Sequence, residues 1–146
     1  MYRGKIVMEI EAAPDRIYEH LFHIDKWHWL LPHCQNVQLE KDDGREQIAI
    51  MEIKNGRDIE RIRTVRHFAE NQWITFDQTP PPAPLAVHRG KWTLEKNGPG
   101  TRVTVDHDIA AKNRTFSWFI ERLAWMMVFR KNSLATLKQI KKVVAK

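Results

Sequence analysis

The sequence predicts an α+β fold in which one long C-terminal helix lies against a curved antiparallel sheet. Two patterns support this: the middle of the chain alternates between apolar and polar residues, and the last third repeats at helical spacing. The length of 146 residues and the 42% apolar content suit a single domain over residues 1–146 with its own core. Because glycine and proline together number only 13 (6 and 7), collagen-like, low-complexity and largely disordered classes are excluded.

The N-terminal part predicts one strand and two short helices. Three apolar residues share one face of an alternating stretch at 5–12, which is typical of a half-buried strand. Pro14 suits the first turn of a helix, and apolar residues then recur at helical spacing as far as Ile24. A second short apolar stretch covers 27–31 and ends before Pro32.

Six further strands are expected in the middle of the chain. The predicted ranges are 36–42, 45–54, 57–69, 72–78, 85–96 and 101–110. Turn residues such as Asn55-Gly56 separate them, as hairpins require.

The last third predicts one long amphipathic helix. A single apolar stripe with a period near 3.6 is formed by Phe116, Phe119, Ile120, Leu123, Met126, Met127, Leu134, Leu137, Ile140 and Val144. We expect this stripe to face the sheet. A bent sheet wrapped on one helix commonly leaves a cavity between them, which favours a bound ligand.

His107 is a polar residue on a strand face that should be buried. It alternates with Val103, Val105 and Ile109, so its side chain is expected to point inward. One interpretation is a core histidine that is hydrogen-bonded to a neighbour, and the other is a catalytic histidine.

Arg66 is the stronger functional candidate, because a buried guanidinium is costly unless it is paired or serves a ligand. It shares the even-numbered face of the strand at 57–69 with Glu60, Ile62, Thr64 and Phe68. The opposite phase stays open, because a bulge would instead turn Arg61, Arg63 and His67 inward.

The stripe of the final helix also carries Arg130 near its centre, between Met127 and Leu134. Arg130 is either a snorkelling arginine at the edge of the core or a residue at the mouth of the cavity. Six tryptophans, Trp27 and Trp92 among them, are core residues or walls of a pocket for aromatic or polyketone ligands.

The sequence carries no motif for a metal or for another cofactor. Four histidines crowd the predicted N-terminal helices, but their spacing matches no metal signature. The one cysteine, Cys34, forbids an internal disulfide and a cysteine-built zinc site, and a reducing cytoplasm is the expected location. No apolar run has the length of a membrane span, and no signal peptide is expected.

The net charge of +6 is unevenly distributed. Residues 112–146 hold nine of the 24 basic residues and one of the 18 acidic ones, a net +8, which leaves 15 basic and 17 acidic, a net −2, elsewhere. A basic element on a near-neutral body indicates an acidic partner.

Three stretches of the second half of the chain are distinctive: Gln78-Thr79-Pro80-Pro81-Pro82-Ala83-Pro84-Leu85, Gly90-Lys91-Trp92 and Gly100-Thr101-Arg102-Val103-Thr104-Val105-Asp106-His107-Asp108. They resemble the bacterial polyketide aromatase/cyclases of the START-like, Bet v 1-like helix-grip superfamily. The opening Ile10-Glu11-Ala12-Ala13-Pro14-Asp15 with Ile24-Asp25-Lys26-Trp27, and the ending from Arg130-Lys131-Asn132-Ser133, are also similar to that superfamily.

This resemblance implies a seven-stranded curved antiparallel sheet that grips the C-terminal helix around an interior cavity. In this family the cavity folds a poly-β-ketone delivered on an acyl carrier protein and promotes aldol cyclisation and dehydration to an aromatic ring. The family's pocket arginine matches Arg66, with Arg63 as second choice, and its histidine matches His107. Some members have an aspartate where Thr136 stands, and others a tyrosine near His33 and Cys34.

We therefore expect catalysis by Arg66 and His107, with Glu60 and His33 as secondary candidates. The expected substrate-binding residues are Arg63, Trp27, His33, Phe68, Trp92, Met127 and Arg130. The expected partners are an acidic acyl carrier protein and a small aromatic polyketide, with neither nucleic acid nor membrane, in a monomer or homodimer that needs no cofactor. Arg66→Ala is expected to stop directed cyclisation and to leave the fold intact.

Two other functions stay open. A carrier of a lipid, quinone or aromatic ligand needs the same cavity but no base. Nucleic-acid binding through the basic helix is the third, although its basic residues are not interleaved with exposed aromatic ones.

Overall fold

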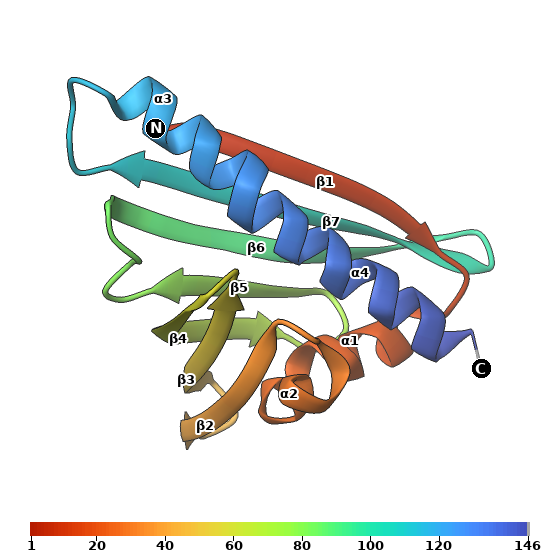
Figure 1. The fold of residues 1–146 in the computed structure, drawn as a ribbon. Helices are drawn as coiled ribbons and strands as arrows, with labels where there is room; N and C mark the ends of the chain where they lie inside the picture. Colours follow the sequence, from red (N-terminus) through yellow and green to blue (C-terminus); the bar gives the residue numbers. More distant parts are fainter. Residues whose placement is uncertain (146) are drawn as a thin grey trace.

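The computed structural model describes residues 1–145 and contains one antiparallel sheet that curves around a long C-terminal helix (Figure 1). The strands are β1 (Tyr2–Ile10), β2 (Cys34–Asp42), β3 (Glu46–Asn55), β4 (Asp58–Ala69), β5 (Trp73–Gln78), β6 (Leu85–Asn97) and β7 (Gly100–Ala111). The helices are α1 (Pro14–Phe22), the 3₁₀ turn η1 (Ile24–Lys26), α2 (Trp27–Leu30), α3 (Ser117–Ala124), the π-helical turn η2 (Trp125–Phe129) and α4 (Arg130–Val144). The predicted α+β class and every predicted strand are confirmed.

Seven strands in the described part of the chain pair in the order β1-β7-β6-β5-β4-β3-β2, and every neighbouring pair is antiparallel. Most of these pairs are hairpins of neighbouring strands. Gly56 in the β3–β4 turn and Gly98 in the β6–β7 turn adopt positive φ angles of 66° and 59°, which glycine tolerates without strain. Only β1 reaches its partner β7 from the far end of the chain.

The core has two parts because the sheet bends. The larger part lies under α3 and α4, with Ile109, Leu137 and Ile140 at its centre. The smaller part packs the start of α2 and residues before β2 against β3 and β4, around Ile24, Leu31 and Ala49. In Figure 1, α1 and α2 lie together at one end of the helix that crosses the sheet.

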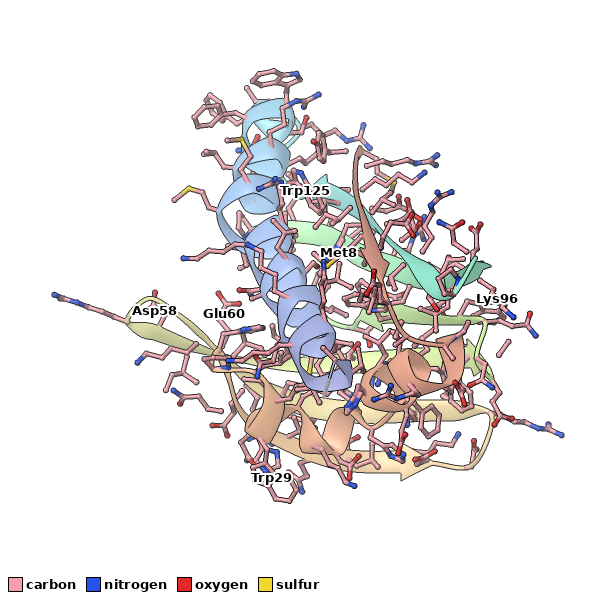
Figure 2. The ribbon with its side chains drawn as sticks, turned by 90° about the vertical axis from the view of Figure 1, so that its right-hand side faces the viewer. Met8, Trp29, Asp58, Glu60, Lys96 and Trp125 are labelled. Atoms are coloured by element: carbon pink, nitrogen blue, oxygen red, sulfur yellow. The ribbon has the colours of Figure 1, made fainter. Side chains whose placement is uncertain are left out.

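The predicted apolar stripe of the final helix is wrong in its first half. Phe116, Phe119, Met126 and Met127 are 57–68% exposed, and Leu123 is also exposed. Trp125, Phe129 and Ser133 face the sheet instead, and Figure 2 shows Trp125 on the side of the helix next to β1.

Two features shift this phase. The π-helical turn η2 has more residues per turn than an α-helix, so a strict 3.6 period fails across it. Gly4 in β1 leaves room for the Trp125 indole, because a Cβ at Gly4 would lie 2.5 Å from the ring atoms. From Leu137 onward the predicted and observed faces agree.

No helix within residues 1–145 has the length and apolarity needed to cross a bilayer.

Candidate active site

An interior cavity of about 100 Å³ lies between the curved sheet and the helix. Strands β3 to β7 supply its floor, and η2 and α4 supply its roof. Its lining comprises Ile24, Trp27, His33, Met51, Ile53, Glu60, Ile62, Thr64, Arg66, Phe76, Gln78, His88, Trp92, His107, Val128, Phe129, Asn132, Ser133 and Thr136. Ten of these nineteen side chains are polar, but most of the surface area of the walls is apolar, as in small-molecule sites.

Arg66 lies in the middle of β4 and is 1% exposed. Its Nη2 donates to the Leu21 carbonyl, and its Nη1 donates to Gln47 Oε1 at 3.1 Å and to the Phe22 carbonyl at 3.4 Å. These two carbonyls end helix α1, so the guanidinium satisfies groups that a helix C-terminus leaves unpaired. Arg66 thus ties α1 to the sheet.

The same guanidinium faces the cavity, 5.4 Å from the centroid of the Trp27 ring. Three of its five N–H groups take part in the bonds to α1 and Gln47, which leaves two for a ligand. Burial lowers the pKa of Arg66 to about 9, so the side chain is still cationic at neutral pH. The site combines a positive charge with apolar walls.

His107 belongs to a chain of four buried polar side chains. His88 Nδ1 lies 2.6 Å from Gln78 Oε1, and His88 Nε2 lies 2.8 Å from His107 Nδ1. His107 Nε2 lies 2.8 Å from Ser133 Oγ on α4. The two histidines are 2% and 4% exposed.

Aromatic rings hold this chain in place. The Phe129 ring stacks on His88 with centroids 3.7 Å apart, and Phe76 and Trp125 lie 5.3 and 5.2 Å from the His107 ring. Burial lowers the pKa of His107 to about 4. Burial, with His107 close by, holds the pKa of His88 well below its usual value. Both imidazoles are therefore neutral at pH 7.

Several of the residues predicted for the site line the cavity. The even-numbered face of β4 points inward, which settles the phase of that strand and brings Arg66 and Glu60 to the cavity. Figure 2 labels Glu60 on the end of β4 that lies beside the helix. Trp27, His33 and Trp92 also line the cavity, and burial lowers the pKa of His33.

Four predicted substrate-binding residues lie elsewhere. Arg63 is on the outer face of β4, where it bonds Thr79 Oγ1 at 3.2 Å and lies 3.7 Å from Glu40. Phe68 packs edge-on against Phe22, with ring centroids 4.9 Å apart, and so supports α1 rather than the cavity.

Met127 is 68% exposed and Arg130 is exposed, since the π-helical turn directs both away from the sheet. None of these four residues lines the cavity.

The expectation that Arg66→Ala leaves the fold intact also disagrees with the structure, because the side chain holds the end of α1.

The sequence prediction missed Gln47, Gln78, His88 and Ser133. His88 alternates with Trp92 and Leu94 on β6, and Gln47 alternates with Ala49 and Met51 on β3, so the test that found His107 would have found both. Ser133 carried no such signal, because its burial depends on the helix phase. Among residues 1–145, no three His, Cys, Asp or Glu side chains converge as metal ligands.

Comparisons with known proteins identify the family of the chain and match its fold. The sequence model of the family described as polyketide cyclase/dehydrase and lipid transport matches residues 10–139. The actinorhodin polyketide synthase bifunctional cyclase/dehydratase of Streptomyces coelicolor is 29% identical over 107 residues, which are 71% of this chain and 33% of that protein. The chain thus spans about a third of the length of this curated relative.

Two solved structures share the fold. The di-domain ARO/CYC BexL from the BE-7585A biosynthetic pathway has a TM-score of 0.91 at 21% identity, over 99% of this chain and 50% of that one. The Zhui aromatase/cyclase from Streptomyces sp. R1128 has a TM-score of 0.87 at 14% identity, over 99% and 93% of the two chains.

Proposed function

Because this chain belongs to the polyketide cyclase/dehydrase and lipid transport family, we propose that it binds a poly-β-ketone in its cavity and promotes aldol cyclisation and dehydration to an aromatic ring. One observation carries this proposal: a buried guanidinium, Arg66, and a neutral imidazole, His107, line the same apolar cavity. An aldol reaction needs a group that stabilises an enolate oxygen and a group that moves a proton. Arg66 supplies the first, and His107 with its hydrogen-bonded neighbours supplies the second.

The size of the cavity sets how much of the substrate reacts at once. About 100 Å³ approaches the roughly 150 Å³ of a cavity that accepts benzene. The site therefore suits the closure of one six-membered ring, with the rest of the chain outside. Holding one methylene against one distant carbonyl supplies rate through proximity and orientation.

Arg66 acts on the carbonyl side of this reaction. A guanidinium in an apolar, water-poor site stabilises negative charge on oxygen far more than it would in water. Its bonds to α1 fix its position before the substrate arrives, so little reorganisation is needed when charge develops.

The substrate is delivered by an acidic acyl carrier protein that docks on the outer face of α3 and η2. This docking face consists of the exposed apolar residues Phe116, Trp118, Phe119, Leu123, Met126 and Met127 with the basic residues Lys112, Arg114, Arg122, Arg130 and Lys131. Arg122 stacks between Trp118 and Tyr2, at 4.3 and 5.0 Å from their ring centroids. Val128 and Phe129 of the same turn line the cavity, so docking there brings a tethered chain close to the site.

The test is product analysis in a minimal polyketide synthase of ketosynthase and carrier protein. Without a cyclase, poly-β-ketones are expected to close spontaneously into a mixture. Adding this protein should convert the mixture to one main aromatic product. An unchanged mixture, with the protein folded and the carrier loaded, contradicts the proposal.

A second function, non-catalytic transport of an apolar aromatic ligand, is favoured by one specific observation. Both ring nitrogens of His107 and three N–H groups of Arg66 already have partners within the protein. If the protein is a carrier, it should bind a hydroxylated aromatic ligand tightly and leave the product mixture unchanged. Product analysis in the minimal synthase therefore distinguishes a carrier from a cyclase.

A further inference from the structure

His107 has no free ring nitrogen. Nδ1 is bonded to His88 and Nε2 to Ser133, each at 2.8 Å. An imidazole bonded on both sides cannot itself take a proton from a substrate carbon. All four members of this hydrogen-bond chain line the cavity, and the Ser133 hydroxyl is its terminal group and a hydroxyl that can both give and take a proton.

The donor and the acceptor in each hydrogen bond of this chain can be assigned by starting from Gln78. Gln78 Oε1 is a carbonyl oxygen and only accepts, so His88 Nδ1 carries a hydrogen. His88 Nε2 then accepts from His107 Nδ1–H, and the remaining lone pair on His107 Nε2 accepts the Ser133 hydroxyl. Each neutral ring thus has one fixed tautomer, and Ser133 presents its oxygen lone pairs to the cavity.

We propose that Ser133 is the catalytic residue that exchanges protons with the substrate, and that His107 and His88 form the relay behind it. This inference rests on the proposed cyclisation and dehydration. In the dehydration step a substrate C–H bond breaks, and its proton passes to Ser133 Oγ while the hydroxyl proton of Ser133 passes to His107 Nε2. The C–O bond then breaks, a C=C bond forms, and the same relay returns one proton to the departing hydroxyl, which leaves as water.

His88 is a positioning residue in this scheme. Its Nε2 accepts from His107 Nδ1–H, which keeps His107 Nε2 free of hydrogen and able to accept from Ser133. It also lets the two rings share the positive charge while the proton is held. The Phe129 ring against His88 and the bond to Gln78 keep its orientation fixed.

The Thr136 hydroxyl and the Cys34 thiol, two other groups near the cavity, do not fit this role. Thr136 lines the cavity one turn from Ser133, but its Oγ1 donates to the Asn132 carbonyl at 2.9 Å. Cys34 bonds the Asn36 carbonyl through Sγ, and burial raises the pKa of its thiol to about 11. Thr136 therefore has no hydrogen bond to an imidazole, and Cys34 is not ionised at neutral pH.

The first arm of the test needs no substrate. In protein labelled with ¹⁵N-histidine, NMR should show His88 and His107 protonated at Nδ1 and unprotonated at Nε2 at pH 7. A hydrogen on His107 Nε2 would reverse the donors and acceptors of these hydrogen bonds and overturn the inference. His88→Asn should leave His107 as a mixture of both tautomers, and an unchanged His107 signal would remove the positioning role of His88.

The second arm measures directed aromatic product in the minimal synthase at varied carrier concentrations. Ser133→Ala, which is compatible with a helix, should lower kcat by about 100-fold or more with little change in KM. Thr104→Val, which removes a hydroxyl from the face of β7 opposite to His107 and outside the cavity, should stay within about threefold of the wild type. If Ser133→Ala also stays within threefold, the role of Ser133 is wrong and the proposed function stands. An inactive wild type contradicts the proposed function, and the NMR arm still decides the direction of the chain.

Discussion

The Arg66 side chain gives a prediction whose size follows from its contacts. Arg66→Ala removes three hydrogen bonds, to the Leu21 and Phe22 carbonyls and to Gln47 Oε1. The Leu21 carbonyl and Gln47 Oε1 then lose their partner, whereas the Phe22 carbonyl keeps its bond from Gln47 Nε2. Each buried acceptor left unsatisfied costs about 1–3 kcal/mol. Because the end of α1 can recruit some water, we take the lower part of this range for the two acceptors and add about 1 kcal/mol for the lost bond to the Phe22 carbonyl. We therefore expect a total of about 3–5 kcal/mol.

In a chain of this length, 1 kcal/mol corresponds to about 2–4 °C in Tm, so Arg66→Ala should melt about 6–20 °C below the wild type. Circular dichroism during heating and urea unfolding measure this loss. The matched control is Arg63→Ala on the same strand, whose exposed contacts with Glu40 and Thr79 should contribute less than about 1 kcal/mol.

Equal melting temperatures for the Arg66→Ala and Arg63→Ala variants would refute the assignment of Arg66 to the end of α1. The result also decides how activity is interpreted. A loss of product in an Arg66 variant supports a role in the reaction only at temperatures where that variant is folded.

Three further predictions concern pH, packing and docking. Burial lowers the pKa of His107 to about 4 in the folded chain, so unfolding takes up a proton between pH 4 and the ordinary value of about 6.5. The stability that comes from the neutral His107 ring should be complete above about pH 6.5 and be lost as the pH falls toward 4. A plot of Tm against pH should show this loss, and the same plot for His107→Gln should be flatter. Gly4→Ala places a methyl group 2.5 Å from the Trp125 ring and should lower the free energy of unfolding by about 1–3 kcal/mol, as measured by urea titration. An unchanged free energy of unfolding would argue against the close packing of β1 on η2. The double variant Met126→Glu, Met127→Glu should leave Tm unchanged and weaken carrier-protein binding by at least about tenfold in calorimetry. The control Ile59→Glu, at an exposed apolar residue on β4, should leave the binding affinity unchanged. Equal affinities for the two variants would exclude the docking face.

The fold and the two central side chains could be predicted from the sequence because strands have a period of two. On β7, His107 alternates with three branched aliphatic residues, and on β4, Arg66 alternates with Ile62 and Thr64. A polar residue in such a row must face the core wherever the row does. The resemblance to the cyclase family singled out the same two residues.

The bonds of these side chains to the end of α1 and to Ser133 could not be predicted, because these partners come from distant elements. Arg66 meets carbonyls 44 and 45 residues earlier in the chain, and His107 meets a serine 26 residues later. Ser133 in particular depends on the π-helical turn at Trp125–Phe129, which changes which residues of the following turn face inward. A regular 3.6 period placed Met127 and Arg130 there instead.

The claim that chemistry takes place in the cavity, between Arg66 and Ser133, is tested most directly by a crystal structure with a bound hydroxylated anthraquinone, a stable mimic of an aromatic polyketide. We predict one ring inside the cavity, with one oxygen within hydrogen-bond distance of an Arg66 N–H and another near Ser133 Oγ. A ligand bound only outside the cavity, with the contacts of Arg66 and Ser133 unchanged, would contradict the account.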